Sequence, residues 1–206
     1  MLVRIVICLA IGYCFGLFQT GYVYGRLVKG IDIRDYGSHS SGATNTVRTL
    51  GKGAGYIVFA GDVLKMVAAV HLVRFIIFPS GAYAWELSMI AGIGVILGHD
   101  FPFYMHFKGG KGISATGGLM LALNPLIALI EGILFGIVFY STRYVSVASL
   151  TVTAVFPFML LIFFPGHPFM VLIAAIIAAF DWWQHRSNIG RLRHGTENRF
   201  DKKKKG

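Results

Sequence analysis

Six apolar runs alternate with polar, glycine-rich segments along this chain of 206 residues. Most of the runs approach the roughly 20 residues that a helix needs to cross the hydrocarbon core of a bilayer. The junctions "PSGA" (79–82) and "PGHP" (165–168) are tight turns that contain neither Lys nor Arg. The pattern therefore predicts an all-α integral membrane protein. The apolar runs lie at about 2–24, 54–78, 83–98, 113–140, 146–164 and 168–183.

Composition supports the same class. Hydrophobic residues make up 55% of the chain and charged residues only 14%, whereas roughly a quarter of a soluble domain is charged. The mean hydropathy is +0.66, and we expect one membrane domain over residues 1–206. Cys8 and Cys14 would point to different faces of a helix, so they are interpreted as small apolar side chains rather than a disulfide or a metal site.

The distribution of Lys and Arg orients the predicted helices. Segments 25–53, 99–112 and 185–206 are rich in basic residues, and such segments remain on the cytoplasmic side of a membrane. The N-terminus and the two charge-free turns then face outward, and the C-terminus is cytoplasmic. The formal charge of +10 also suggests nucleic-acid binding. That function leaves the apolar bulk unexplained, whereas a basic tail suits anionic lipid headgroups.

The run at 113–140 conflicts with this orientation if it crosses the membrane once, because the basic tail would then lie outside. Asn124-Pro125 sits near its middle, and proline breaks a helix while it pushes the preceding residue out of the α region. We therefore predict two short helices, 113–123 and 126–140, that dip into the membrane and return. The total is seven helices, some of them too short to span a bilayer alone.

Glycines recur four positions apart in several runs, a spacing that lets membrane helices approach closely. We interpret them as helix contacts within one chain. The pairs are Gly12 with Gly16, Gly21 with Gly25, Gly94 with Gly98, and Gly132 with Gly136.

Charged residues inside apolar runs are costly and often functional. Asp62 and Lys65, at spacing i, i+3, share a helix face and can neutralise one another. They are either a packing and registry pair or part of a site. Glu131 has no local partner, so it is either protonated or paired with Arg or His from another helix.

Three polar segments share the predicted cytoplasmic side and carry donors suited to phosphate. Gly-, Ser- and Asn-rich loops that lead into a helix present N–H groups to an anion. Lys111 is followed by Gly112 rather than Ser or Thr, so its loop is not a Walker A nucleotide loop. The segments are 36–55, 98–112 and 185–200.

Histidine supplies the candidate general base. His185 ends the last apolar run, close to Asn188, and imidazole titrates near neutral pH. A metal pair of His99 and His106 lacks supporting Cys or carboxylate residues at ligand spacing, so no metal is predicted.

These segments together resemble the bacterial glycerol-3-phosphate acyltransferases that use acyl-phosphate as donor, the PlsY family. The resemblance runs in order from about residue 10 to 200. It departs where the family usually has Asn and this chain has Ser40, and where "ISATGG" is permuted against the common Val-Ala-Thr-Ala. The matching stretches are "GSHSSGATNTVRTLGKGAG" (37–55), "GHDFPFYMHFKGGKG" (98–112) and "HRSNIGRLRHGTE" (185–197), together with the Asp62–Lys65 pair and "TRYVS" (142–146).

The resemblance implies a seven-helix fold and transfer of an acyl group from acyl-phosphate to the 1-hydroxyl of sn-glycerol 3-phosphate. The products are lysophosphatidic acid and phosphate, in the first step of phospholipid synthesis. The two substrates and membrane lipids are the expected partners, with no cofactor, no nucleic acid and no obligate protein partner. The expected location is the cytoplasmic membrane of a bacterium, with the active site facing the cytoplasm.

Both substrates carry phosphate, so two anion cradles are needed. Lys111 with neighbouring glycine N–H groups would hold one phosphate. Arg48, with His185 and Asn188, would hold the other or orient the hydroxyl, whose proton goes to His185 or to the donor's own phosphate. The implied catalytic residues are Lys111, His185, Asn188 and Ser146. The implied substrate-binding residues are Ser38, Asn45, Arg48, Gly109, Gly110, Gly112, Arg186 and Glu197.

Two other functions fit parts of the sequence. A transporter for a phosphorylated small molecule suits broken helices and intramembrane charge, but the two halves show no internal symmetry. A structural membrane protein with a lipid-binding tail leaves the three polar segments without a purpose. The acyl-CoA-dependent acyltransferases with His-x4-Asp are disfavoured, because no His here has Asp five positions later.

Overall fold

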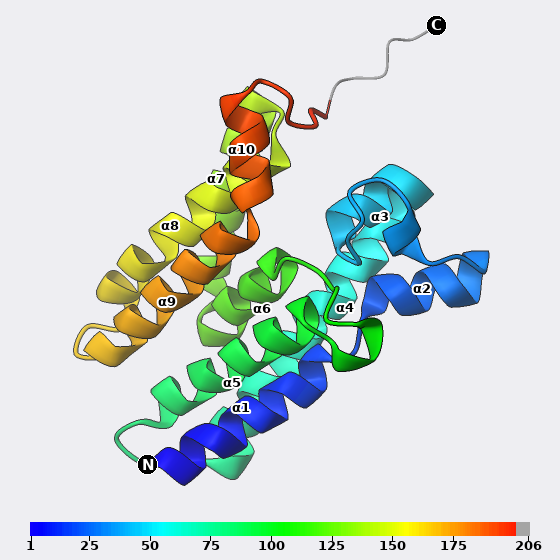
Figure 1. Ribbon diagram of the computed structural model, residues 1–206. Coiled ribbons are helices and arrows are strands. Elements are labelled where there is room, and N and C mark those ends of the chain that lie inside the picture. Colours follow the sequence, from blue (N-terminus) through cyan, green and yellow to red (C-terminus); the bar gives the residue numbers. More distant parts are fainter. Residues whose placement is uncertain (201–206) are drawn as a thin grey trace, which may run out of the picture. The chain divides into compact units, whose positions relative to one another are not determined.

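The structure is a computed structural model that describes residues 1–200, and every regular element in that range is helical (Figure 1). This confirms the all-α prediction. The chain divides into two compact units, Met1–Pro125 and Leu126–Gly206, and each is described by itself. Lys202 to Lys205 of the basic tail lie outside the described residues.

The first unit contains six α-helices among its described residues. A π-helical turn, Leu72–Ile77, extends α4, and two 3₁₀ turns, Ile33–Asp35 and Phe103–Met105, lie in the polar segments. The helices are α1 (Leu2–Gly16), α2 (Thr20–Lys29), α3 (Ala43–Leu50), α4 (Lys52–His71), α5 (Ala84–Asp100) and α6 (Ile113–Leu123).

Helices α1 and α5 pack side by side along a seam of glycines (Figure 1). A Cβ placed on Gly12 would lie 2.9 Å from the Cα of Gly94, and one placed on Gly98 would lie 3.0 Å from the Cα of Gly16. Real Cβ atoms essentially never approach within 3.0 Å, and these two would come closer than that to the backbone carbonyls of Ala91 and Tyr13, respectively. Two of the predicted glycine pairs therefore face each other, which confirms close packing of helices within the chain.

The other two glycine pairs do not follow this pattern. Gly21 and Gly25 of α2 pack against the backbone of the segment 31–41 rather than against a helix. Among the described residues, no atom lies within 4 Å of a Cβ placed on Gly132 or Gly136. Spacing alone does not distinguish a glycine that packs from one that lies on an open face.

The first apolar run is interrupted, although the sequence predicts a continuous helix over 2–24. Helix α1 ends at Gly16, and Gln19 has non-helical backbone angles of φ −98° and ψ 86° before α2 begins. The Gln19 side chain donates a hydrogen bond of 3.1 Å to the carbonyl of Gly16. A terminal carbonyl of α1 is thus satisfied by a side chain, which stabilises the break.

The run at 113–140 breaks where the sequence predicts. Asn124 is extended, with φ −160° and ψ 118°, and Pro125 begins the next helix. Helix α6 has 11 residues and α7 (Pro125–Thr142) has 18, so α7 is longer than the predicted 126–140. At about 1.5 Å per residue, α7 approaches the thickness of a bilayer core, whereas α6 does not.

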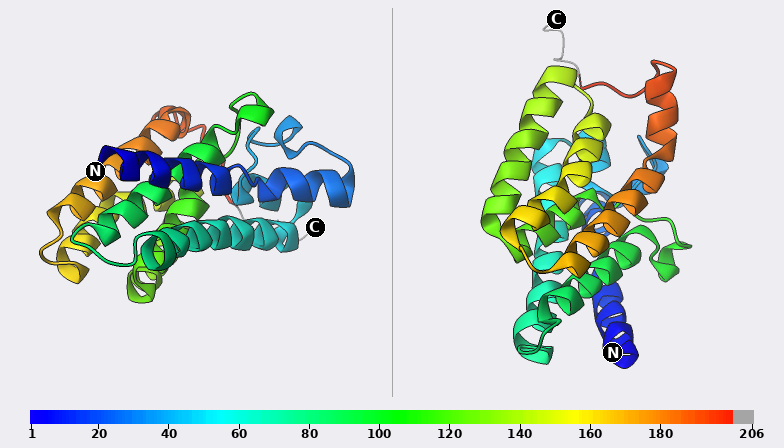
Figure 2. Two further views of the ribbon diagram at one scale, coloured as in Figure 1. Left: turned by 90° about the horizontal axis from the view of Figure 1, so that it is seen from below. Right: turned by 90° about the vertical axis from the view of Figure 1, so that its left-hand side faces the viewer.

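Up to residue 200, the second unit consists of α7, from Leu126 onward, and three further helices. Helices α8 (Val145–Phe163) and α9 (Pro168–Gln184) run antiparallel across a short turn and pack on each other (Figure 2). Trp182 Nε1 donates a hydrogen bond of 3.2 Å to the carbonyl of Leu150 between them. The short helix α10 (Arg186–Arg193) follows α9 at a bend of 58°.

Five helical stretches among the described residues are long and apolar enough to cross a membrane, and α9 with α10 makes a sixth if the bent pair is one span. Seven membrane helices, with the N-terminus outside and the C-terminus cytoplasmic, stay a prediction. The sequence also misses α3 and α10, which it assigns to loops. Apolar runs mark membrane-length helices, and short polar helices carry no such signal.

Candidate functional site

The first polar segment is organised around the buried side chain of Asn45, near the start of α3. Its Oδ1 accepts the N–H of Ser38 at 2.7 Å, and its Nδ2 lies 2.8 Å from the carbonyl of Ser40 and 3.0 Å from that of Tyr36. The amide is therefore used to shape the loop. Any contribution of Asn45 to substrate binding is through the loop, and the side chain of Ser38 stays a candidate donor.

The second polar segment folds back onto the end of α5. The N–H of Gly109 donates to the carbonyl of Asp100 at 3.0 Å, and the N–H of Gly110 donates to that of His99 at 3.0 Å. A Cβ on Gly109 would collide with the His99 carbonyl, and one on Gly110 would collide with His99 Nε2. These glycines are required because the loop lies directly on α5.

The sequence predicts that the N–H groups of Gly109, Gly110 and Gly112 hold a phosphate together with Lys111, and in the structure those of Gly109 and Gly110 donate to carbonyls of α5. An N–H that already donates to a carbonyl is not available to a phosphate. Gly112 differs, because it has a positive φ of 79° and directly precedes α6. It turns the chain into the helix, with half-buried Lys111 beside it. Lys111 and Gly112 therefore remain the candidates for phosphate binding in this loop.

Arg34, just before the first polar segment, links that segment to the second, and its carbonyl lies 2.9 Å from Nδ1 of His39. Its Nη1 donates to the carbonyls of Met105 at 3.0 Å and Lys108 at 3.2 Å. Asp32 holds the guanidinium from the other side, with Arg34 Nη2 donating to Oδ2 at 2.7 Å. Hydrogen bonding from Arg34 lowers the pKa of Asp32 below its ordinary value. Arg48, by contrast, is exposed in the last turn of α3.

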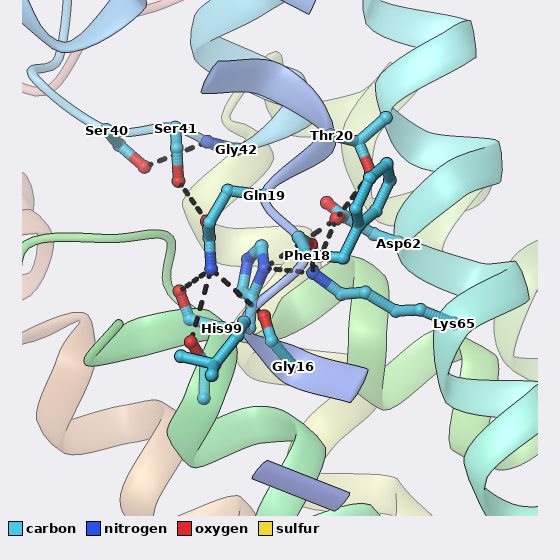
Figure 3. A network of polar contacts seen from close by, with 12 residues as sticks. Gly16, Phe18, Gln19, Thr20, Ser40, Ser41, Gly42, Asp62, Lys65 and His99 are labelled. Carbon is cyan, nitrogen blue, oxygen red and sulfur yellow. Dashed lines mark hydrogen bonds and ion pairs between the residues drawn. The ribbon is translucent and has the colours of Figure 1, made fainter. Parts of the chain in front are cut away.

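A buried polar network lies beneath these loops (Figure 3). Lys65 Nζ lies 3.0 Å from Asp62 Oδ1 and 2.8 Å from His99 Nδ1, and donates to the carbonyl of Phe18 at 2.8 Å. The predicted Asp62–Lys65 pair is thus confirmed, and it has His99 as a third member. Because an ammonium group only donates, Nδ1 of His99 accepts and Nε2 carries the proton, on the side of Gly110.

Gln19 is the residue of this region that the sequence analysis misses. It is completely buried, and its side chain contacts both the end of α5 and the first loop. The available signal is a polar side chain, next to Thr20, inside the apolar run at 2–24. Its partners are 22 and 80 positions away, so spacing along the chain does not identify them.

In the second unit, Glu197 brings together side chains from α8 and α10. Its Oε1 accepts hydrogen bonds from Ser146 Oγ at 3.0 Å and Asn188 Nδ2 at 2.7 Å, and its Oε2 accepts one from Arg191 Nε at 2.7 Å. Burial alone would raise the pKa of Glu197, but the hydrogen bonds from Asn188, Arg191 and Ser146 together lower it. Three of the predicted site residues therefore meet, with Arg191 as an addition.

These contacts favour a positioning role for Glu197 over the direct substrate contact predicted. Both of its oxygens are used by protein donors, and a carboxylate repels phosphate. Asn188 donates through Nδ2 to Glu197, so the carboxylate fixes the position of this amide.

His185 is buried at the junction of α9 and α10. Its Nδ1 lies 2.8 Å from the carbonyl of Asp181, which can only accept, so the neutral ring carries its proton on Nδ1. Nε2 is then the basic nitrogen. Arg186 is exposed, donates to the carbonyl of Trp183 at 3.0 Å and lies 4.3 Å from the centre of that indole.

Glu131 is buried in α7, and neither of its carboxyl oxygens has a hydrogen-bond partner among the described residues. Of the two alternatives for Glu131, pairing with Arg or His from another helix is therefore not seen among the described residues. Within residues 1–200, no group of three or more His, Cys, Asp or Glu side chains is placed to hold a metal ion.

The structure is similar to solved structures of an integral membrane acyltransferase. Crystal structures of PlsY (YgiH), an integral membrane glycerol 3-phosphate acyltransferase, match with TM-scores of 0.85 for its glycerol 3-phosphate form and 0.84 for its lysophosphatidic acid form. Both are 33% identical over 96% of this chain and cover 96% and 95% of theirs. The fold and the polar segments thus define a membrane-embedded acyltransferase.

The sequence identifies the family. The family model for glycerol-3-phosphate acyltransferase matches residues 6–195. A glycerol-3-phosphate acyltransferase of Thermoanaerobacter sp. (strain X514) is 39% identical over 193 residues, which are 94% of each chain. This chain belongs to the glycerol-3-phosphate acyltransferase family.

Proposed function

We propose that this chain transfers an acyl group from acyl-phosphate to the 1-hydroxyl of sn-glycerol 3-phosphate. The hydroxyl oxygen attacks the acyl carbon, the bond from that carbon to the phosphate oxygen breaks, and the hydroxyl proton is taken up. The products are lysophosphatidic acid and inorganic phosphate. Membership of the family and likeness to an acyltransferase in its glycerol 3-phosphate and lysophosphatidic acid forms support the acceptor and the product.

The glycine–lysine loop at 107–112 is the observation that carries the proposal. It lies on the end of α5 and turns at Gly112 directly into α6. Lys111 supplies a cation there, and the first turn of α6 has N–H groups without helical partners. This arrangement suits a phosphate that gains charge as it leaves. Gly109 and Gly110 contribute by allowing the loop to lie on α5.

His185 and Asn188 are the proposed partners of the attacking hydroxyl. His185 Nε2 is the basic nitrogen of the ring, and the side-chain amide of Asn188, held by Glu197, is proposed to orient the hydroxyl. Ser146 and Glu197 hold Asn188 in place. The phosphate of the acyl-phosphate is the alternative proton acceptor. Arg48, Arg186 and Ser38 are the remaining residues proposed to donate hydrogen bonds to a substrate phosphate.

An acyl-phosphate donor suits these residues because it is already activated. It needs neither an enzyme nucleophile nor a cofactor, only cationic groups at the leaving phosphate and the developing oxyanion. The acyl chain belongs among the membrane helices, while the phosphates belong at polar loops. We place those loops on the cytoplasmic side, because they contain the basic residues that the positive-inside rule assigns there.

The experiment measures phosphate and lysophosphatidic acid release by the purified protein with glycerol 3-phosphate and either palmitoyl-phosphate or palmitoyl-CoA. We expect turnover with palmitoyl-phosphate only, with the two products in equal amounts. Turnover with palmitoyl-CoA alone would overturn the donor. Phosphate release without lysophosphatidic acid would indicate hydrolysis and overturn the acceptor.

A further inference from the structure

A closed ring of hydrogen bonds connects the break between α1 and α2 with both polar loops of the first unit. Gln19 Nε2 donates to the carbonyl of His99 at 2.9 Å, and the N–H of Gly110 donates to that same carbonyl at 3.0 Å. Ser41 Oγ donates to Gln19 Oε1 at 2.8 Å. The ring closes with the N–H of Ser41, which donates to the carbonyl of Gly109 at 3.4 Å.

The centre of this ring is the side-chain amide of Gln19 (Figure 3). Its nitrogen donates to carbonyls at the end of α5 and its oxygen accepts from the first loop, so one planar group forms hydrogen bonds with two segments. Gln19 is 0% exposed, and Ser41 is 1% exposed. Buried polar groups that lose their hydrogen-bond partners destabilise the fold. An arrangement in which one loop shifts and breaks the Gln19 hydrogen bonds is therefore strongly disfavoured.

We propose that Gln19 is a positioning residue that fixes the Ser40–Gly42 turn relative to the Gly109–Gly110 turn. The inference rests on the proposed function, in which these loops lead to the phosphate-binding groups Lys111 and Arg48. Gln19 itself touches no substrate. It sets the distance between the two loops. That distance must fit the substrate phosphates that Lys111 and Arg48 are proposed to bind.

The chemistry of the site requires an amide of this length. Glutamate keeps the acceptor for Ser41 but places a carboxylate against the carbonyls of Gly16, Gly98 and His99, which accept from Gln19 at 2.9 to 3.2 Å. Methionine matches the length and flexibility of glutamine without donors or a strong acceptor. Gln19→Met therefore removes the ring while it preserves the packing volume.

The test compares Gln19→Met with Ser41→Ala, which removes the Oγ link and leaves Gln19 in place. We expect Gln19→Met to raise the KM for at least one phosphate substrate by about tenfold, with kcat changed less than about threefold. Ser41→Ala should shift KM in the same direction by a smaller factor. Because both remove the same ring, the double variant should be no worse than Gln19→Met.

The control is Ser88→Ala, which removes a buried hydroxyl that donates to the carbonyl of Trp85 within α5 and belongs to neither loop. Its KM values should match those of the wild type. A merely structural role for Gln19 reduces the amount of active enzyme, which lowers apparent kcat and leaves KM unchanged. Unchanged KM values in Gln19→Met would therefore overturn the proposal.

Hydrogen exchange of peptides covering 36–42 and 98–112 provides a readout that does not depend on catalysis. Gln19→Met should speed amide exchange in both segments, because Gln19 no longer holds Ser41 and the His99 carbonyl, and the N–H bonds of Ser41 to Gly109 and of Gly110 to His99 then open more often. Faster exchange in one segment alone, or in neither, would overturn the link between the loops. An inactive wild type would overturn the proposed function and leave this exchange test intact.

Discussion

Asn188 donates a hydrogen bond of 2.7 Å to Glu197, nine positions later, and so closes the segment after α10 onto that helix. Glu197→Gln keeps the size of the side chain but removes the charge that pairs with Arg191 and turns one acceptor into a donor. We expect a loss of about 1–3 kcal/mol in unfolding free energy and at least a tenfold loss of kcat. Thermal unfolding and phosphate release check this, with exposed Asn198→Ala as the control that should change neither.

The Asp32–Arg34 pair predicts a pH dependence of stability. Hydrogen bonding holds the pKa of Asp32 below its ordinary value of 3.8 in the folded protein. Between those two pKa values the unfolded state binds a proton that the folded state does not, so stability falls as pH falls. Wild type should exceed Asp32→Asn by about 1 kcal/mol or less at neutral pH, with the difference shrinking below about pH 4. A difference that grows in acid would contradict this.

Gly110 provides the sharpest steric test of the second loop. Alanine there would place its Cβ against His99 Nε2, so the loop must shift. Displacement of catalytic groups by about 1 Å can cost about 10²-fold in rate, and we expect a loss of that order in kcat/KM. Gly117→Ala in α6 is the matched control, because no described atom lies within 4 Å of its Cβ. Equal activity of the two variants would place the loop away from the chemistry.

Asp62 and Lys65 should behave as one unit. Lys65→Met leaves the carboxylate of Asp62 buried without its cation, and we expect a loss of about 3–5 kcal/mol in unfolding free energy. Asp62→Asn with Lys65→Met should cost less than the sum of the single changes, since neither charge is then left unpaired. A double-mutant cycle by thermal or denaturant unfolding measures this coupling. Strict additivity would show that the ion pair contributes nothing beyond packing.

Lys111→Ala tests the proposed phosphate contact. Removing a cation aimed at a leaving phosphate should lower kcat/KM by about 10²-fold or more, while insertion and thermal unfolding stay near those of the wild type. Lys52→Ala, which removes an exposed lysine at the start of α4, serves as the charge-matched control. Near-normal turnover of Lys111→Ala would remove this residue from the site.

The parts of the structure that sequence reasoning reaches are those controlled by local chemistry. Asn124-Pro125 breaks a helix through the proline ring itself, and Asp62 meets Lys65 because i, i+3 positions share a helix face. Glycines four apart indicate a surface that can approach another helix. They do not say which surface, which is why Gly12 and Gly16 pack while Gly132 and Gly136 remain open.

The contacts that sequence reasoning misses join distant positions. Gln19 and His99 are 80 positions apart, and their hydrogen bond depends on where α1 and α5 end relative to each other. The amides of Gly109 and Gly110 look available in a glycine-rich loop, and only the fold back onto α5 uses them. In the sequence, Arg191 is one basic residue among several in a polar segment. Its hydrogen bond to Glu197 forms only because the chain folds back after α10.

The glycine seam between α1 and α5 has a consequence for the order of assembly. Helix α1 leaves the ribosome first, but its partner surface, Gly94 and Gly98, is synthesised only after α4 and the turn that follows it. Until then, Gln19 lacks its acceptors on α5. Docking of the first loop onto the second is therefore a late event, and a chain truncated before α5 would keep the Asn45 contacts that shape the first loop but would lack the second loop and the His99 carbonyl.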